Sequence, residues 1–267
     1  MPASPSSSSP PLCRIDNSFV RGRNVLFSEG SPQPLFTAWE RHCRRFNINP
    51  PAQLAELFRN FLAAFTLHAA SHPRNEVLAW TIHLQDPHCS LFLTADTELS
   101  TLTGRVHTDH LRKEETNLFY QDLVVRGKPP HRSIVPFEGT SAKGAVEFFY
   151  SQSEQRPGRL FFVADNHYIL AGAHPDYDRR WFRNLSPPEA RTLREKEVVA
   201  PIESRGFRWH CGCSHQKILD ILSSPMRADA EALFGEEERI QVNCPRCAAK
   251  YTVTREAMEA RVGEKEA

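Results

Sequence analysis

Four of the seven cysteines form two close pairs near the C-terminal end, and this spacing constrains the fold more than any other feature of the sequence. Cys211 and Cys213 stand in "WHCGCSHQK". After an interval of 30 residues, Cys244 and Cys247 stand in "NCPRCAAK". Three interpretations are open for such pairs: two disulfides, one metal site, or a site that changes between those states.

The first residues and the most apolar helix candidate indicate the cellular compartment of the protein. "MPASPSSSSPPL" has neither a basic nor an apolar segment, so it does not resemble a secretory signal. The most apolar helix candidate, residues 54–70, contains charged side chains and is too short and polar to span a bilayer. We therefore expect a cytoplasmic protein without a membrane partner. In that reducing compartment, paired cysteines favour metal ligation or redox chemistry over permanent disulfides.

The two pairs suit a single zinc ion. Four thiolates bind Zn²⁺ tetrahedrally at about 2.3 Å, and the Cys-x-x-Cys half resembles a zinc knuckle, whose turn directs backbone amides at the sulfurs. Residues 214–235 indicate two helices and residues 237–243 a strand that delivers Cys244, which brings the halves together. We predict a zinc site formed by Cys211, Cys213, Cys244 and Cys247. A site in which His210 or His215 replaces one cysteine is the alternative.

The role of such a zinc ion stays open between structure and switching. A module of about fifty residues has too small a core to fold alone. Structural zinc contributes about 10–16 kcal/mol in small peptides, against about 5–15 kcal/mol for the stability of a whole domain. Redox-inert zinc is therefore a sufficient explanation. A switch is also open, because each thiolate has a neighbour with which an oxidised sulfur can form a disulfide.

Upstream of the cysteines, the pattern alternates between helices and strands. We expect helices at residues 35–46, 50–71 and 140–154, and strands at 76–84, 89–95, 117–125, 132–137, 159–165 and 167–172. From Asp176 to Arg205, charged residues dominate and large apolar residues are few, so this segment should pack weakly as a linker. Within it, "SPPE" predicts the start of a short helix.

No motif supports an enzyme. Residues 139–146, "GTSAKGAV", have glycines at phosphate-loop spacing but lack the following Lys-Ser/Thr, and the chain has no Gly-x-Ser-x-Gly. His68 and His72 stand four apart, but "HAASH" lacks the glutamate of a metalloprotease motif, so we do not expect them to be metal ligands. Cys89 is expected to be a small buried apolar residue. A formal net charge of +1 gives no general attraction to nucleic acid.

The residues match a known family. Cys211-Gly-Cys213, the 30-residue interval, Cys244-Pro-Arg-Cys247 and the aromatic Tyr251 resemble the zinc-binding end of the heat-shock protein 33 family. Residues 133–165, with "SQSEQRP" as their most distinctive run, are similar to a strand, helix and strand of that family. "NPPAQLAELFRNFLAAFTLHAA" resembles its long apolar helix. The likeness extends over about residues 16–258.

The resemblance implies an α+β fold, with a mixed sheet-and-helix domain, a short helical linker and a small four-cysteine zinc module. We accordingly divide the chain into five parts. They are a disordered Pro/Ser-rich tail (1–15), a chaperone-like α+β domain (16–172), a charged helical linker (173–206), a zinc-binding redox-switch domain (207–258) and a charged tail (259–267).

Family membership would also define the activity. These proteins are cytoplasmic holdases that bind unfolding client proteins without ATP and hold one zinc ion while reduced. Under oxidative stress, disulfides form within each half, here Cys211 with Cys213 and Cys244 with Cys247. Zinc is then released, the module and linker unfold, and activation commonly accompanies dimerisation.

Two departures indicate a divergent member of the family, in which the zinc is retained and the switch is altered. The segment between Gly172 and Cys211 is shorter than the linker of the family, and the Pro/Ser tail is additional. The alternative is a protein- or RNA-binding module in which redox-inert zinc only maintains the fold.

Overall fold

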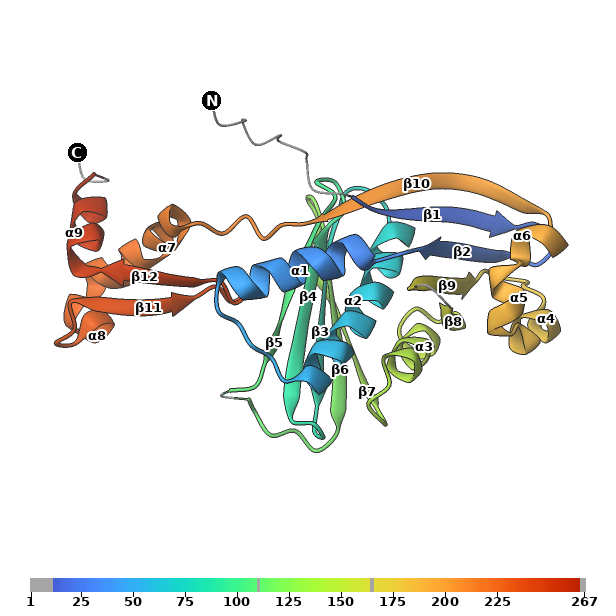
Figure 1. The fold of residues 1–267 in the computed structure, drawn as a ribbon, viewed down its shortest axis with the longest axis horizontal. Coiled ribbons are helices and arrows are strands. Elements are labelled where there is room, and N and C mark those ends of the chain that lie inside the picture. The colour runs from blue at the N-terminus through green and yellow to red at the C-terminus, as the bar shows by residue number, and fades with distance from the viewer. Residues whose placement is uncertain (1–11, 110, 164–165, 265–267) are drawn as a thin grey trace, which may run out of the picture. The chain divides into compact units, whose positions relative to one another are not determined.

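The computed structural model describes residues 12–109, 111–163 and 166–264, and the fold is α+β, as predicted (Figure 1). Contacts divide the chain into two compact units. The first, the sheet unit, contains residues up to Glu40 and Pro50–His210. The second, the cysteine unit, contains Arg41–Asn49 and the residues from Cys211 onward. In the described part of the chain, no helix is both long and apolar enough to cross a membrane.

A ten-stranded sheet forms the frame of the sheet unit in the described residues, in the order β7-β6-β3-β4-β5-β10-β1-β2-β9-β8. Its strands are β1 (Cys13–Val20), β2 (Val25–Gly30), β3 (Glu76–Leu84), β4 (Cys89–Asp96), β5 (Thr101–His107), β6 (Asn117–Val125), β7 (His131–Phe137), β8 (Gly158–Val163), β9 (His167–Ala173) and β10 (Val199–Trp209). Neighbouring strands are antiparallel except β10 and β5, which are parallel. Strands β3 and β6 coincide with the predicted ranges, because their apolar residues alternate clearly.

Helix α2 (Ala52–Ser71) occupies the centre of the core of this unit. All its side chains from Phe61 to Ala70 are buried, because the helix contacts β1, β2, β4, β5, β9 and α3 (Ala142–Gln152). A helix that is apolar around its whole circumference is stable only when it is covered on all sides. Two polar side chains, Thr66 and His68, are consequently placed in the core with 0% exposure.

The segment expected to be a weakly packed linker is instead part of this unit. Helices α4 (Arg179–Asn184), α5 (Pro187–Arg191) and α6 (Leu193–Lys196) bury Phe182, Leu185 and Leu193 against apolar residues of β1, β2, β8 and β9. The helix start predicted at "SPPE" is present as a capping box, in which the Ser186 amide donates to the Glu189 carboxylate over 2.8 Å. A few apolar side chains suffice to pack these helices onto the unit, because strands β1, β2, β8 and β9 supply the other apolar residues of the cluster.

Strand β10 accounts for the rest of the predicted helical linker, so that expectation was wrong for residues 199–206. The strand pairs with β1 on one side and β5 on the other. Arg205 is only 3% exposed, and its guanidinium donates to the carbonyls of Ala69, Ala70 and His72 at the C-terminal end of α2. A cation in this position satisfies carbonyls that the helix leaves unpaired and complements its dipole.

The cysteine unit has a small core of its own. It contains the C-terminal end of α1 (Gln33–Arg45), helices α7 (His215–Ala228), α8 (Ala230–Phe234) and α9 (Arg255–Glu264), and the hairpin of β11 (Arg239–Asn243) and β12 (Lys250–Thr254). Six buried residues form the main cluster: Ile218, Leu219, Met226, Phe234, Val253 and Met258. Arg261 of α9 joins α7 through an ion pair with Asp220 at 2.6 Å.

Both predicted tails are partly structured. Residues 1–11 lie outside the described residues, but β1 already begins at Cys13, within the predicted tail of residues 1–15. At the other end, α9 continues to Glu264, and residues 265–267 lie outside the described residues.

Candidate metal centre

Cys211 and Cys213 lie between the end of β10 and the start of α7. Gly212, between them, has a φ of +72°, a left-handed conformation that glycine adopts without strain. The Lys217 ammonium donates to the Gly212 carbonyl over 2.7 Å. Ser214 caps α7 by accepting from the Lys217 amide. The helix start and the glycine turn together fix the backbone that carries both sulfurs.

Cys244 and Cys247 lie in the turn between β11 and β12. The Cys244 amide donates to the Ala249 carbonyl over 2.8 Å, and the Ala248 amide donates to the Cys244 carbonyl over 2.9 Å. The amides of Arg246 and Cys247 point at the Cys244 sulfur, and the Ala249 amide points at the Cys247 sulfur. This is the arrangement that the sequence predicts for a zinc knuckle.

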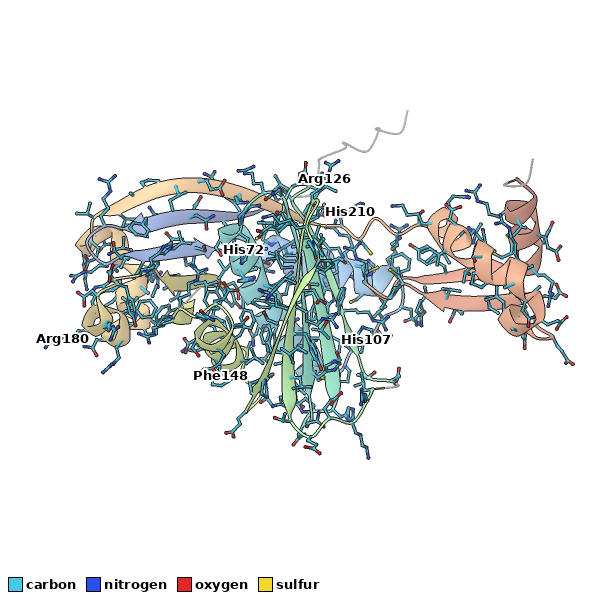
Figure 2. All side chains as sticks on the ribbon, turned by 180° about the vertical axis from the view of Figure 1, so that it is seen from behind. His72, His107, Arg126, Phe148, Arg180 and His210 are labelled. Carbon is cyan, nitrogen blue, oxygen red and sulfur yellow. The ribbon has the colours of Figure 1, made fainter. Side chains whose placement is uncertain are left out.

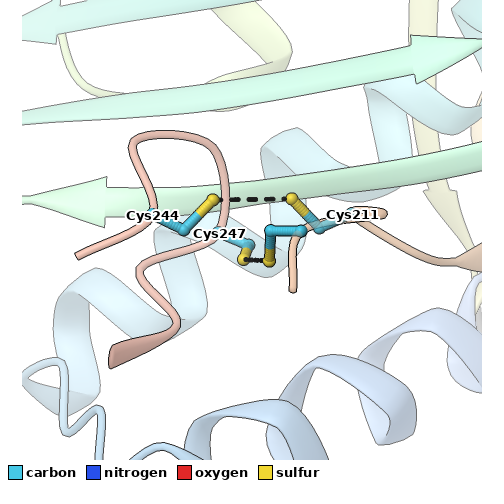
Figure 3. A group of neighbouring side chains, drawn as sticks. Cys211, Cys244 and Cys247 are labelled. Atoms are coloured by element: carbon cyan, nitrogen blue, oxygen red, sulfur yellow. Dashed lines mark hydrogen bonds between the residues drawn. The ribbon is translucent and has the colours of Figure 1, made fainter. Parts of the chain in front are cut away.

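The structure brings the four predicted sulfurs together (Figure 3). Cys211 Sγ lies 3.6 Å from Cys244 Sγ, and Cys213 Sγ lies 3.5 Å from Cys247 Sγ. All four lie within 4.8 Å of one another. Tetrahedral zinc with bonds of about 2.3 Å separates its sulfur ligands by about 3.8 Å. The donor set and its spacing therefore fit one zinc ion shared by the two halves.

Neither histidine that was an alternative ligand joins this cluster. His215 Nε2 lies 3.1 Å from the Thr252 carbonyl oxygen, so that nitrogen is occupied by the backbone of β12. His210 is exposed and belongs to the sheet unit. Among the described residues, the metal-competent group at this place consists of the four cysteines alone.

The pKa values of the cysteine thiols are shifted in opposite directions. Hydrogen bonds from the Cys211 and Cys247 thiols, assisted by the Arg246 and Cys247 amides, hold the pKa of Cys244 well below its usual value. The same hydrogen bonds raise the pKa of Cys211 and of Cys247, since a thiol that donates keeps its proton. A thiolate at Cys244 is thus stabilised by its neighbours. A divalent cation would take the place of the shared protons.

The residues that surround the sulfurs come partly from a distant segment. His42, near the end of α1, places Nε2 2.8 Å from the Cys247 carbonyl oxygen. Phe46 packs against the Tyr251 ring, and the Tyr251 hydroxyl donates to Cys213 Sγ over 3.1 Å. The sequence marks Tyr251 only as an aromatic of the family motif and gives no sign of His42 and Phe46. No local pattern marks residues about two hundred positions away in the chain.

Comparisons with known proteins point to one family. Residues 181–254, which contain all four cysteines, match the model of the family described as Hsp33 protein. A 33 kDa chaperonin of Nitrosococcus oceani is 29% identical over 158 residues, which cover 51% of this chain and 55% of that protein, so the chain spans about half of that relative. A 33 kDa chaperonin of Shewanella baltica is 24% identical over 266 residues, which cover 89% of each chain.

The fold extends the likeness to nearly the whole chain. The crystal structure of the 33 kDa chaperonin of Thermotoga maritima, a heat shock protein 33 homologue, superimposes with a TM-score of 0.67 at 14% sequence identity. The superposition covers 95% of this chain and 99% of that one. The cysteine-bearing end of this chain is therefore similar to Hsp33 proteins, and the fold of nearly the whole chain is similar to that of a 33 kDa chaperonin.

Proposed function

We propose that this chain is an ATP-independent holdase chaperone that binds unfolding client proteins in the cytoplasm and is activated by oxidation of its paired cysteines. One observation carries the proposal: sulfurs from two segments 30 residues apart lie within 4.8 Å of one another. The family supports the chaperone part, since the curated relatives are named 33 kDa chaperonins.

In the reduced state, Cys211, Cys213, Cys244 and Cys247 would hold one zinc ion. When bound, the ion would keep the sulfurs as thiolates and cross-link the two halves of the cysteine unit. Cys244 and Cys247 are 4% and 1% exposed, whereas Cys211 and Cys213 are partly exposed. The first pair to meet a dissolved oxidant is therefore Cys211 and Cys213.

Oxidation requires one peroxide for each disulfide. A thiolate sulfur attacks hydrogen peroxide and becomes a sulfenic acid, with the other oxygen leaving as hydroxide. The neighbouring sulfur then displaces the sulfenic oxygen, so that two sulfurs lose two electrons and, with their protons, one peroxide becomes two waters. The products are the pairs Cys211–Cys213 and Cys244–Cys247, which no longer supply ligands and no longer join the two halves.

Loss of the cross-link would open the cysteine unit. Its small cluster, which includes Ile218, Phe234 and Val253, would then be exposed together with Phe46, and these side chains would offer apolar surface to clients. Residues 179–209 are packed or paired within the sheet unit, so opening would begin at Cys211 and not in the segment before it. A newly exposed apolar surface also favours a homodimer in the oxidised state.

Client capture tests this proposal directly. A chemically unfolded reporter enzyme is diluted into reduced, zinc-loaded chain and into peroxide-treated chain, and each mixture is separated by gel filtration with light-scattering detection. We expect the client to co-elute only with the oxidised chain, which should itself elute as a dimer. The buried Cys89 provides a matched control, since Cys89→Ser removes a thiol from β4 and should leave the response unchanged.

Other outcomes would change the assignment. Co-elution with both forms would mean that the zinc is redox-inert and that the chain binds clients constitutively. Co-elution with neither form would favour a protein- or RNA-binding module. RNA retention that weakens steeply with salt would then identify phosphate contacts, although the net charge of +1 does not lead us to expect them.

A further inference from the structure

A second group of potential metal ligands lies in the sheet unit, at the C-terminal end of α2. His68 belongs to the last turn of this helix, His72 follows its end, and Glu154 lies just beyond α3. Figure 2 labels His72 at the end of α2. One ligand atom from each of the three residues lies within 4.8 Å of the others. The four paired cysteines belong to the other unit and take no part in this group.

The hydrogen bonds of His72 leave one nitrogen available. Its Nδ1 lies 2.8 Å from the Glu76 carboxylate, which can only accept, so Nδ1 carries the proton. When the ring carries this single proton, its lone pair is on Nε2. That nitrogen is buried and has no hydrogen-bond partner. A histidine whose one nitrogen donates to a carboxylate while the other is aimed into the protein has the arrangement of a metal ligand.

His68 is oriented by an equally definite set of bonds. Gln121 Oε1 accepts from Trp80 Nε1 over 2.8 Å and from His68 Nε2 over 2.7 Å, because Gln121 and Trp80 are opposite one another in β6 and β3. The proton of His68 is therefore on Nε2 and the lone pair on Nδ1, which accepts from the Tyr150 hydroxyl over 2.8 Å. Burial holds the pKa of His68 well below its usual value, so the ring stays neutral.

Glu154 supplies the charge that two neutral imidazoles lack. Its Oε1 accepts from Gln121 Nε2 over 3.2 Å, and its Oε2 lies 3.8 Å from an Arg156 nitrogen. Two guanidiniums face the carboxylates of Glu154 and Glu76: that of Arg156, and that of Arg205, which donates to the His72 carbonyl. A divalent cation would bind the unpartnered His72 nitrogen and the Glu154 carboxylate, and it would accept the His68 lone pair that now accepts from the Tyr150 hydroxyl.

We propose that His68, His72 and Glu154 form a second metal site, which takes a divalent ion of the zinc class and is independent of the four cysteines. Two imidazole nitrogens and one carboxylate oxygen are ligands typical of Zn²⁺ and Co²⁺, and they differ from the ligands that Ca²⁺ and Mg²⁺ prefer. The site contains no sulfur. Peroxide that converts the cysteines to disulfides therefore leaves its ligands unchanged.

Metal stoichiometry of the full chain tests the site. Metal-free chain is incubated with excess zinc, separated from free ion, and analysed for zinc per chain before and after peroxide treatment. We expect the chain to bind one equivalent of zinc in addition to the ion held by the four cysteines. Peroxide should leave this additional equivalent bound. His72→Gln and Glu154→Gln should each lose it, whereas His83→Gln, which removes a partly buried histidine from β3, should retain it.

Cobalt distinguishes the two kinds of ligand. Binding to thiolates gives an intense sulfur-to-cobalt charge-transfer band, whereas binding to imidazole and carboxylate gives only weak visible bands. The histidine site should produce the weak bands in wild type and lose them in His72→Gln, with the charge-transfer band unaltered. A wild-type chain that binds no metal beyond its cysteine site would overturn the proposal, as would variants that retain the additional equivalent. Cys244→Ser alters the sulfur-to-cobalt charge-transfer band but leaves the additional equivalent bound, so failure of either site is recognised separately.

Discussion

His42 Nε2 lies 2.8 Å from the carbonyl oxygen of Cys247, a residue 205 positions later in the chain. The carbonyl belongs to the knuckle that carries Cys244 and Cys247, so the end of α1 holds this turn from outside. The Lys250 ammonium adds a second connection, since it donates to the Asn47 carbonyl over 3.1 Å. Residues 41–49 are thus a structural part of the cysteine unit, although motif and spacing assign that unit to the C-terminal residues alone.

This contact predicts that His42→Ala weakens metal retention. The substitution removes one hydrogen bond and the ring contact with Phe46, at a cost of about 1–2 kcal/mol, which corresponds to about tenfold in affinity. Competition with a coloured chelator measures the change. Arg41→Ala, at an exposed position of the same helix, is the control and should retain wild-type affinity. Equal affinities for the two variants would show that α1 does not support the knuckle.

Tyr251 is expected to restrain the reactivity of Cys213. Its hydroxyl donates to the sulfur over 3.1 Å, and a hydrogen bond to a thiolate lowers its electron density and nucleophilicity. Tyr251→Phe keeps the ring against Phe46 but removes the donor, so peroxide should consume thiols several times faster. Thiol titration during peroxide treatment measures the rate, with Tyr177→Phe in the sheet unit as control. An unchanged or slower rate would contradict this role.

Metal removal should affect the two units differently. The cysteine unit depends on a small cluster of buried residues, whereas α2 and the ten described strands give the sheet unit an extensive core. All four tryptophans, Trp39, Trp80, Trp181 and Trp209, belong to the sheet unit. A chelator should therefore leave tryptophan emission nearly unchanged while protease cleavage appears beyond Cys211. A red shift in emission that accompanies cleavage would mean that the units unfold together.

The stability of the sheet unit should fall in mild acid. Burial depresses the pKa of His68 well below its usual value, and burial together with Arg105 lowers the pKa of His107 to about 4. Histidine in the unfolded chain has a pKa of about 6.5, so below that value the unfolded state binds more protons than the native state. Stability is then lost as pH falls from about 6.5, by up to about 1.4 kcal/mol per pH unit for each such histidine.

Thermal unfolding of the chelator-treated chain, followed by tryptophan emission at about pH 7.5 and about pH 5, measures this loss. His107→Gln should make the pH dependence shallower, since its side chain binds no proton in this range. His131→Gln, at an exposed position of β7, is the control and should keep the wild-type profile. A melting temperature that is the same at both pH values would contradict the prediction.

Local patterns predicted much of this molecule, and contacts between distant segments account for the rest. Strands β3 and β6 and helix α2 were predictable because their apolar residues recur at the strand period or in one long run. Strand β10 was not, because Pro201, Glu203 and Arg205 give it a polar sequence that becomes a strand only between β1 and β5. Its buried arginine is explained by the carbonyls of α2, which no sequence window contains.

Both candidate sites likewise combine residues that local patterns predict with residues that only contacts between distant segments bring near. The four cysteines were predictable because their spacing is local and their chemistry specific, whereas His42 and Phe46 reach them only through the fold. His68 and His72 are visible as a pair in the sequence, but "HAASH" has no glutamate between them and therefore does not predict a metal site. Glu154, the carboxylate that completes the group, lies beyond α3 and is brought near by packing of α3 on α2.

Aggregation of a heat-unfolded client, followed by light scattering, tests the central claim most directly. The reduced, zinc-loaded chain is compared with the peroxide-treated chain, and both are compared with a Cys244→Ser/Cys247→Ser variant. We predict that only the oxidised wild-type chain suppresses scattering among the wild-type samples, and that the variant responds equally with and without peroxide. Equal suppression by the reduced and oxidised wild-type chains, or by neither, would contradict the claim that these four cysteines switch the chaperone on.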